Sequence, residues 1–138
     1  MQTHHTTCNC GAVKLEIRGE RLFQFCCHCD DCQAVHGGAC VPVMMLPVDA
    51  VKVGGGETTA WQRMVTPRHT CAKCGARRFA EPPDMGVRGV IAHPLPPERF
   101  HPTCHGRRQH AVMPARNGLP HHKGFPTVWG GLDETVAW

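Results

Sequence analysis

The stretch FCCHCDDCQ, residues 25–33, places four cysteines and one histidine in nine positions, and it constrains the fold more than any other part of the chain. Such a density of thiols indicates disulfide bonds, a bound metal or a reactive nucleophile. The first residues are polar and lead directly into another cysteine pair, so we expect no signal peptide and a cytoplasmic location, where thiols stay reduced. A disulfide framework is therefore disfavoured, and a metal becomes the leading explanation.

The composition predicts one mostly-β domain over residues 1–138. Gly 15 and Pro 12 exceed average usage, while aromatic residues make up only 6% of the chain. This composition predicts short strands, many turns and a small core, so the fold needs a stabilising cross-link in addition to apolar burial. The longest apolar run, residues 39–46, is too short to cross a membrane. The net charge of +4 is scattered, without the clustered cations typical of nucleic-acid binding.

Hydrophobic patterns predict where the elements lie. Apolar and charged residues alternate over residues 13–18, as in a half-buried strand, and Gly19 follows as a turn. A single helical turn over residues 32–38 would stop at Gly37 and Gly38. Further strands or extended segments are expected at 22–26, 41–46, 48–53, 58–65 and 87–92, with a hairpin at 69–79 and a loop at 93–102.

Two short cysteine pairs, far apart in the sequence, have the spacing of a four-thiolate zinc site. Each pair is followed by a glycine, Gly11 or Gly75, and such knuckles often need a residue in the left-handed conformation. A closed, structural zinc would add folding energy that the thin core lacks. Four free buried thiols are the less favoured alternative. The expected ligands are Cys8, Cys10, Cys71 and Cys74.

The middle group, Cys27, Cys29 and Cys32, offers three ligands. Three protein ligands with one open position are typical of catalytic zinc. Cys26 would face the other side of a strand from Cys27, so we expect it to pack as a small apolar residue. In the second-ranked alternative, a bulge lets all four thiolates bind one closed zinc.

Histidines around these cysteines carry weaker signals. His36 follows Cys32 by four residues, so one helical turn would place both on one face. It could be a fourth ligand, a general base or a polar residue at a helix end. His28 is expected to point away from the metal. The remaining cysteines, Cys40 and Cys104, are expected to be buried, and the histidines at 101, 105, 110, 121 and 122 to be mostly solvated.

Five segments give the chain a family resemblance, and they are CNCGAVKLEIRGE, CCHCDDCQAVHGG, GGGETTAWQ, CAKCGARRF and NGLP. With these segments the chain resembles the glutathione-dependent formaldehyde-activating enzyme family (the CENP-V/GFA domain), most strongly over residues 5–120. The resemblance implies an Mss4-like fold of small coiled antiparallel sheets with zinc knuckles, similar to methionine sulfoxide reductase B. It also implies a structural zinc on the outer pairs and a catalytic zinc on the middle group.

The family's namesake reaction adds glutathione to formaldehyde, a carbon–sulfur lyase type of chemistry. We therefore expect an enzyme that uses about two zinc ions per chain and takes a small thiol, such as glutathione, with an aldehyde. Cys27, Cys29, Cys32 and His36 are the candidate catalytic residues. The main alternative is a non-enzymatic zinc-binding interaction module of similar fold. A zinc-ribbon nucleic-acid binder and a redox or metal-storage site are further alternatives.

Overall fold

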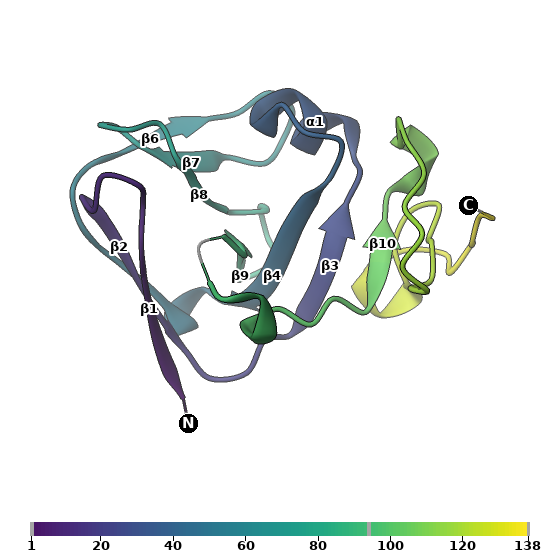
Figure 1. Ribbon diagram of the computed structural model, residues 1–138, viewed down its shortest axis with the longest axis horizontal. Coiled ribbons are helices and arrows are strands. Elements are labelled where there is room, and N and C mark those ends of the chain that lie inside the picture. The colour runs from purple at the N-terminus through teal and green to yellow at the C-terminus, as the bar shows by residue number, and fades with distance from the viewer. Residues whose placement is uncertain (1, 94, 138) are drawn as a thin grey trace. The chain divides into compact units, whose positions relative to one another are not determined.

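The computed structural model describes residues 2–93 and 95–137, and the chain is mostly β (Figure 1). Met1 and Trp138, the ends of the expected domain, and Pro94, in the expected loop, lie outside the described residues. Within the described part, ten strands form two sheets beside one α-helix, which confirms the expected fold class. No helix in that part combines the length and the apolar character needed to span a membrane.

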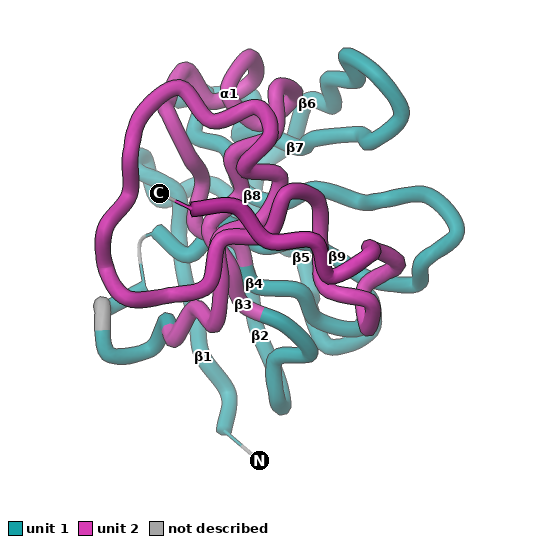
Figure 2. Tube along the Cα trace, turned by 90° about the vertical axis from the view of Figure 1, so that its right-hand side faces the viewer, with its two compact units in different colours: residues 1–23, 44–100 teal, residues 24–43, 101–138 magenta. Residues whose placement is uncertain are grey.

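The chain divides into two compact units, drawn in different colours in Figure 2. Unit 1 contains residues 1–23 and 44–100, and unit 2 contains residues 24–43 and 101–138. Each unit is therefore built from two separated stretches of chain. The expectation of a single domain stays a prediction.

The first sheet of unit 1 is a three-stranded antiparallel ribbon in the order β1-β2-β5. Its central strand has the predicted alternation, because Val13, Leu15 and Ile17 are at most 1% exposed while Lys14 points to solvent. Strands β1 and β2 run side by side as a hairpin (Figure 1). The bounds are β1 Thr3–Thr7, β2 Val13–Arg18 and β5 Val51–Gly55.

Unit 1 also contains four consecutive antiparallel strands in the order β9-β8-β7-β6. Strands β7 and β8 form the expected hairpin around the second cysteine pair, with a register shift between His69 and Thr70. These strands are β6 Thr58–Trp61, β7 Arg68–Cys71, β8 Arg77–Ala80 and β9 Val87–Ile91.

The core of unit 1 collects apolar side chains from both of its sheets. Phe79 is its aromatic member, and partly buried Phe100 packs against it. With so few aromatic residues, the core depends on aliphatic side chains and methionine. Its buried members are Leu15, Ile17, Met44, Leu46, Val51, Phe79, Val90 and Ala92.

Unit 2 has the strand order β10-β3-β4, with β10 parallel to β3. The ring of Phe125, near the C-terminus, packs edge-on against Phe25 with their centroids 5.2 Å apart, and the Arg107 guanidinium lies 5.0 Å from the Phe125 centroid. These contacts anchor the C-terminal segment to the strands of the unit. Unit 2 contains α1 Asp30–His36 and β10 Cys104–Gly106, together with the parts of β3 Phe23–Cys27 and β4 Val41–Pro47 that fall within residues 24–43. Four 3-10 turns complete the chain at Val48–Ala50, Pro97–Arg99, Arg108–His110 and Thr127–Trp129.

Most expected elements are present, and the differences have local causes. The helix begins at Asp30, two residues earlier than expected, because the Cys29 sulfur caps it by accepting the Cys32 N–H at 3.1 Å. The apolar run at 48–53 contains a 3-10 turn before β5, and β6 ends at Trp61 instead of continuing to residue 65. Strands β1 and β10 were not expected, because one is polar and the other is only three residues long.

Replacing one buried leucine tests the position of this core. Leu46 is fully buried, so Leu46→Ala should lower the free energy of unfolding by about 2–5 kcal/mol through lost burial and a cavity. Leu132, at 80% exposed, provides a matched control, and Leu132→Ala should change it by less than about 0.5 kcal/mol. Denaturant titration of the two variants measures both values. Equal losses would contradict the assignment of Leu46 to the core.

Candidate metal centres

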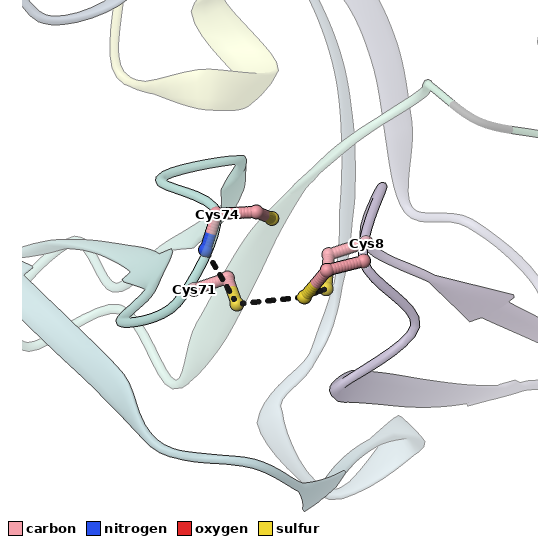
Figure 3. Close-up of side chains that lie close together, drawn as sticks. Cys8, Cys71 and Cys74 are labelled. Carbon is pink, nitrogen blue, oxygen red and sulfur yellow. Dashed lines mark hydrogen bonds between the residues drawn. The ribbon is translucent and has the colours of Figure 1, made fainter.

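The four outer cysteines of unit 1 come together from two chain segments. Their side chains gather at one point, where those of Cys8, Cys71 and Cys74 point toward one another (Figure 3). All four Sγ atoms lie within 4.8 Å of one another, although Cys10 and Cys71 are 61 residues apart in the sequence. The spacing pattern in the sequence thus corresponds to one cluster of sulfur atoms.

The sulfur–sulfur distances fit a metal better than a disulfide. The Sγ atoms of Cys8 and Cys10 are 3.5 Å apart, and those of Cys10 and Cys71 are 3.7 Å apart. A disulfide bond would require about 2.05 Å. Four sulfurs around a tetrahedral zinc with bonds of about 2.3 Å lie about 3.8 Å from one another. The cluster can therefore hold a metal ion with little rearrangement.

The two cysteine segments have matching backbone hydrogen bonds. The Cys8 N–H donates to the Val13 carbonyl at 3.0 Å, and the Cys71 N–H donates to the Ala76 carbonyl at 2.9 Å. In each loop the first cysteine's carbonyl accepts the N–H of the following glycine at 2.9 Å, from Gly11 or Gly75. These glycines have φ values of 79° and 74°, the left-handed conformation that the sequence predicted.

The thiols of the four-cysteine cluster have unequal pKa values, because a negative charge on one sulfur disfavours the ionisation of its neighbours. The backbone N–H of Val13 and the neighbouring sulfurs lower the pKa of Cys8 to about 6. The backbone N–H of Ala12 lowers the pKa of Cys10, but burial and the three other sulfurs outweigh it and raise the value to about 11. Four thiols this close do not all ionise at neutral pH without a cation.

The second cluster lies in unit 2 and has three sulfur atoms. Cys27 ends β3, Cys29 caps α1, and Cys32 occupies the first turn of that helix. Their Sγ atoms lie within 4.8 Å of one another, and Cys27 and Cys32 are buried. Hydrogen bonds with Cys29 and Cys32, together with burial, raise the pKa of Cys27 well above its ordinary value. This cluster too can hold a metal ion.

Neither Cys26 nor His36 contributes a donor atom to this three-cysteine cluster. In β3 the half-buried Cys26 alternates with buried Phe25 and Cys27, as expected for a side chain on the opposite face of a strand. Burial raises the pKa of Cys26 to about 11, so it is a thiol at neutral pH. His36 lies in the last turn of α1, and its ring nitrogens are not among the clustered donor atoms.

Comparison with known proteins gives the family. A family model described as glutathione-dependent formaldehyde-activating enzyme matches residues 3–108. The chain belongs to this family. The match contains both cysteine clusters and ends before residues 109–138, so the C-terminal segment lies outside it. The sequence-based resemblance is confirmed.

Structural comparison supports the fold. A crystal structure of a Rhodobacter sphaeroides protein, a structural genomics target, matches with a TM-score of 0.55 and 21% sequence identity. The match covers 70% of this chain and 94% of that chain. At this identity the likeness concerns the fold alone. No curated protein is similar enough in sequence to count as a relative.

Several other expectations need correction. Cys40 is exposed instead of buried, whereas Cys104 is buried as expected. His105 was expected to be solvated, yet it is only 2% exposed, because it lies in the short parallel strand β10. His121 and His122 are half-buried, while His101 and His110 are exposed. A three-residue strand is too short for its periodicity to be recognised, so the sequence gave no signal for the burial of His105.

Sequence reasoning also missed Arg78, a buried cation near the four-cysteine cluster. Arg78 is 2% exposed, and its Nη2 donates to Thr6 Oγ1 at 2.8 Å. Within the described residues its buried Nε has no hydrogen-bond partner. Burial lowers the pKa of Arg78, while the nearby Cys8, Cys74 and Cys71 act in the opposite direction. A buried guanidinium with a spare donor is suited to a cluster that becomes negative when its thiols ionise.

Removing this cation should lower the stability of the metal-bound four-cysteine cluster. We expect Arg78→Met to lower the free energy of unfolding of the zinc-loaded protein by about 3 kcal/mol, because the thiolates lose their buried countercharge. Arg78→Lys should recover part of the loss. Lys52, an exposed cation of the same unit, provides the control, and Lys52→Met should change the free energy of unfolding by less than about 0.5 kcal/mol. Denaturation and zinc competition would measure the effect, and equal behaviour of the two Met variants would contradict it.

Proposed function

We propose that this chain is a zinc-dependent enzyme of the carbon–sulfur lyase type that handles a thiol–aldehyde adduct. Glutathione, or another small thiol, and formaldehyde, or a related aldehyde, are the proposed substrates. The observation that carries the proposal is the contrast between the two clusters, one with four sulfurs and the other with three. Membership of the glutathione-dependent formaldehyde-activating family supports the substrate class.

The two clusters would have different roles. Cys8, Cys10, Cys71 and Cys74 would saturate a tetrahedral zinc, which therefore stabilises the fold. Cys27, Cys29 and Cys32 would leave one coordination position for a substrate. A zinc held there supplies a Lewis acid that lowers the pKa of a bound thiol.

The residues of unit 2 would then position the reactants and move a proton. The addition forms one carbon–sulfur bond, and the carbonyl π electrons move to oxygen, which takes up the proton lost by the thiol. His36 is the proposed base, because it follows Cys32 by one turn on the same face of α1. Holding the thiol beside the aldehyde would account for much of the rate enhancement.

A reducing compartment such as the cytoplasm suits this chemistry. None of the ten cysteines forms a disulfide bond in the structure. Both clusters need reduced sulfur to bind metal, and oxidation would convert their thiols to disulfides or sulfenic acids. We therefore propose a cytoplasmic location.

A zinc-stabilised interaction module is the second candidate. It is favoured by three apolar side chains that lie exposed at and after the end of β6. Trp61, Met64 and Val65 are each more than 60% exposed. Exposed apolar side chains that gather in one segment often mark protein-binding surfaces. Such a module would not need the substrate position at the three-cysteine cluster.

Metal content and activity separate the two candidates. We expect two zinc ions in the wild type and one in a folded Cys29→Ser variant, because only the three-cysteine cluster loses a ligand. Cys26→Ser is the matched control and should keep both ions. Cys71→Ser should unfold, because the four-cysteine cluster loses its metal. Atomic absorption and circular dichroism measure these outcomes.

The same variants test catalysis. Exchange NMR would follow conversion between free glutathione and its formaldehyde adduct, and Cys29→Ser should lower the enzymatic rate about a hundredfold. Cys26→Ser should keep the wild-type rate. A wild type with two zinc ions and no rate above background, with glutathione or any other small thiol, would favour the interaction module.

A further inference from the structure

A buried polar network adjoins the three-cysteine cluster in unit 2. His28, between Cys27 and Cys29, is 1% exposed, and His105 and Arg108 are 2% and 1% exposed. Buried polar side chains of this size cost folding free energy unless hydrogen bonds satisfy them. The partners of these side chains therefore show what the network holds in place.

The hydrogen bonds of the network have a defined direction. Asn117 Oδ1 accepts the Leu119 N–H at 3.2 Å, which identifies it as the amide oxygen, so the His105 Nε2 at 2.9 Å must be the donor. In a neutral imidazole this makes His105 Nδ1 an acceptor, and His28 Nε2, 2.9 Å away, donates to it. His28 Nδ1 is then an acceptor and receives the Arg108 Nη1–H at 3.2 Å. Each histidine consequently has one defined tautomer.

The main chain at His28 is fixed as well. Its N–H donates to the Gly106 carbonyl at 3.0 Å, and its carbonyl accepts the Gln33 Nε2–H at 2.8 Å. The ring and both backbone polar groups of His28 are therefore all held. Because this residue links Cys27 to Cys29, its orientation limits the separation of their two sulfurs.

His105 is itself held by the C-terminal segment beyond the family match. Its N–H donates to the Pro120 carbonyl at 2.8 Å, and its carbonyl accepts the His122 N–H at 2.9 Å. The ring of His121 stacks on the His105 ring with centroids 4.6 Å apart and an angle of 5°. Residues 117–122 thus fix both the ring and the backbone of His105.

We propose that His105, with its tautomer set by Asn117, is a positioning residue for the three-cysteine cluster. Its Nδ1 holds the ring of His28, and through it the link between Cys27 and Cys29. The proposal rests on the proposed function in one respect, namely that these cysteines bind a metal. It gives residues 109–138, outside the family match, a direct part in shaping the site.

Two substitutions at His105 separate a hydrogen-bonding role from a packing role. His105→Asn keeps an acceptor on Cγ, where Nδ1 was, but loses the ring. His105→Phe keeps the ring that stacks on His121 but loses the acceptor. If His105 positions His28 by hydrogen bonding, the Asn variant should resemble the wild type and the Phe variant should not. A packing role predicts the reverse order.

The measurement is zinc release to a chelator from the fully loaded protein. The release phase that is missing in Cys29→Ser belongs to the three-cysteine cluster. In His105→Phe this phase should be about tenfold faster, the size of effect typical of lost outer partners of a metal site. His105→Asn should stay within about twofold of the wild type. His101→Phe, at an exposed histidine of the same unit, is the matched control and should match the wild type.

Nitrogen NMR of labelled histidine gives a readout that is independent of folding in the variants. In the wild type we expect both His28 and His105 to carry their proton on Nε2. The inference would be overturned, and the proposed function left standing, if either histidine carries its proton on Nδ1. The same holds if zinc release from His105→Phe is no faster than zinc release from His105→Asn. If the wild type lacks the zinc-release phase of the three-cysteine cluster, the proposed function would be overturned, and the inference with it.

Discussion

Thiols that lie within 4.8 Å of one another cannot all ionise unless a cation balances them, and this constraint shapes both halves of the chain. In unit 1 the cluster joins a hairpin near the N-terminus to the loop between β7 and β8. Cys8 and Cys71 also pack with Val13 in a small apolar cluster of their own, separate from the main core. A metal at this point would link two chain segments that are far apart in the sequence, since Cys10 and Cys71 are separated by 61 positions.

The two clusters differ in more than the number of sulfurs. The four-cysteine cluster lies on two loops with matching backbone hydrogen bonds, and buried Arg78 supplies a nearby positive charge. The three-cysteine cluster is formed where a strand passes into a helix, and one of its sulfurs caps that helix. Two loops with matching hydrogen bonds suit a closed structural site, because each supplies two of the four sulfurs. The proposed function requires that the three sulfurs at this strand–helix junction leave one coordination position of the metal for a substrate.

Buried histidines make the surroundings of the second cluster specific. Burial, Arg108 and His105 lower the pKa of His28 to about 4, so this ring stays neutral over the physiological range. A neutral ring can donate one hydrogen bond and accept another at the same time. His28 and His105 each do both, in the series of hydrogen bonds that runs from Arg108 to Asn117. The last member, Asn117, lies beyond residues 3–108, the part of the chain that the family model matches.

Much of this could be predicted from the sequence, because the determining interactions are local. The alternation in residues 13–18, the cysteine spacings and the glycines at 11 and 75 each reflect a short-range geometric requirement, and the structure has all three features. The mostly-β class and the separation of Cys26 from Cys27 followed from the same local rules. The burial of His105 and Arg78 and the hydrogen bond of Asn117 were different, because they depend on partners more than ten residues away or on the pairing of a very short strand. Sequence by itself determined which cysteines form each short group, since knuckle spacing is set within a few residues. Only the tertiary structure decided which polar side chains surround them, since burial is a property of distant segments packed against one another.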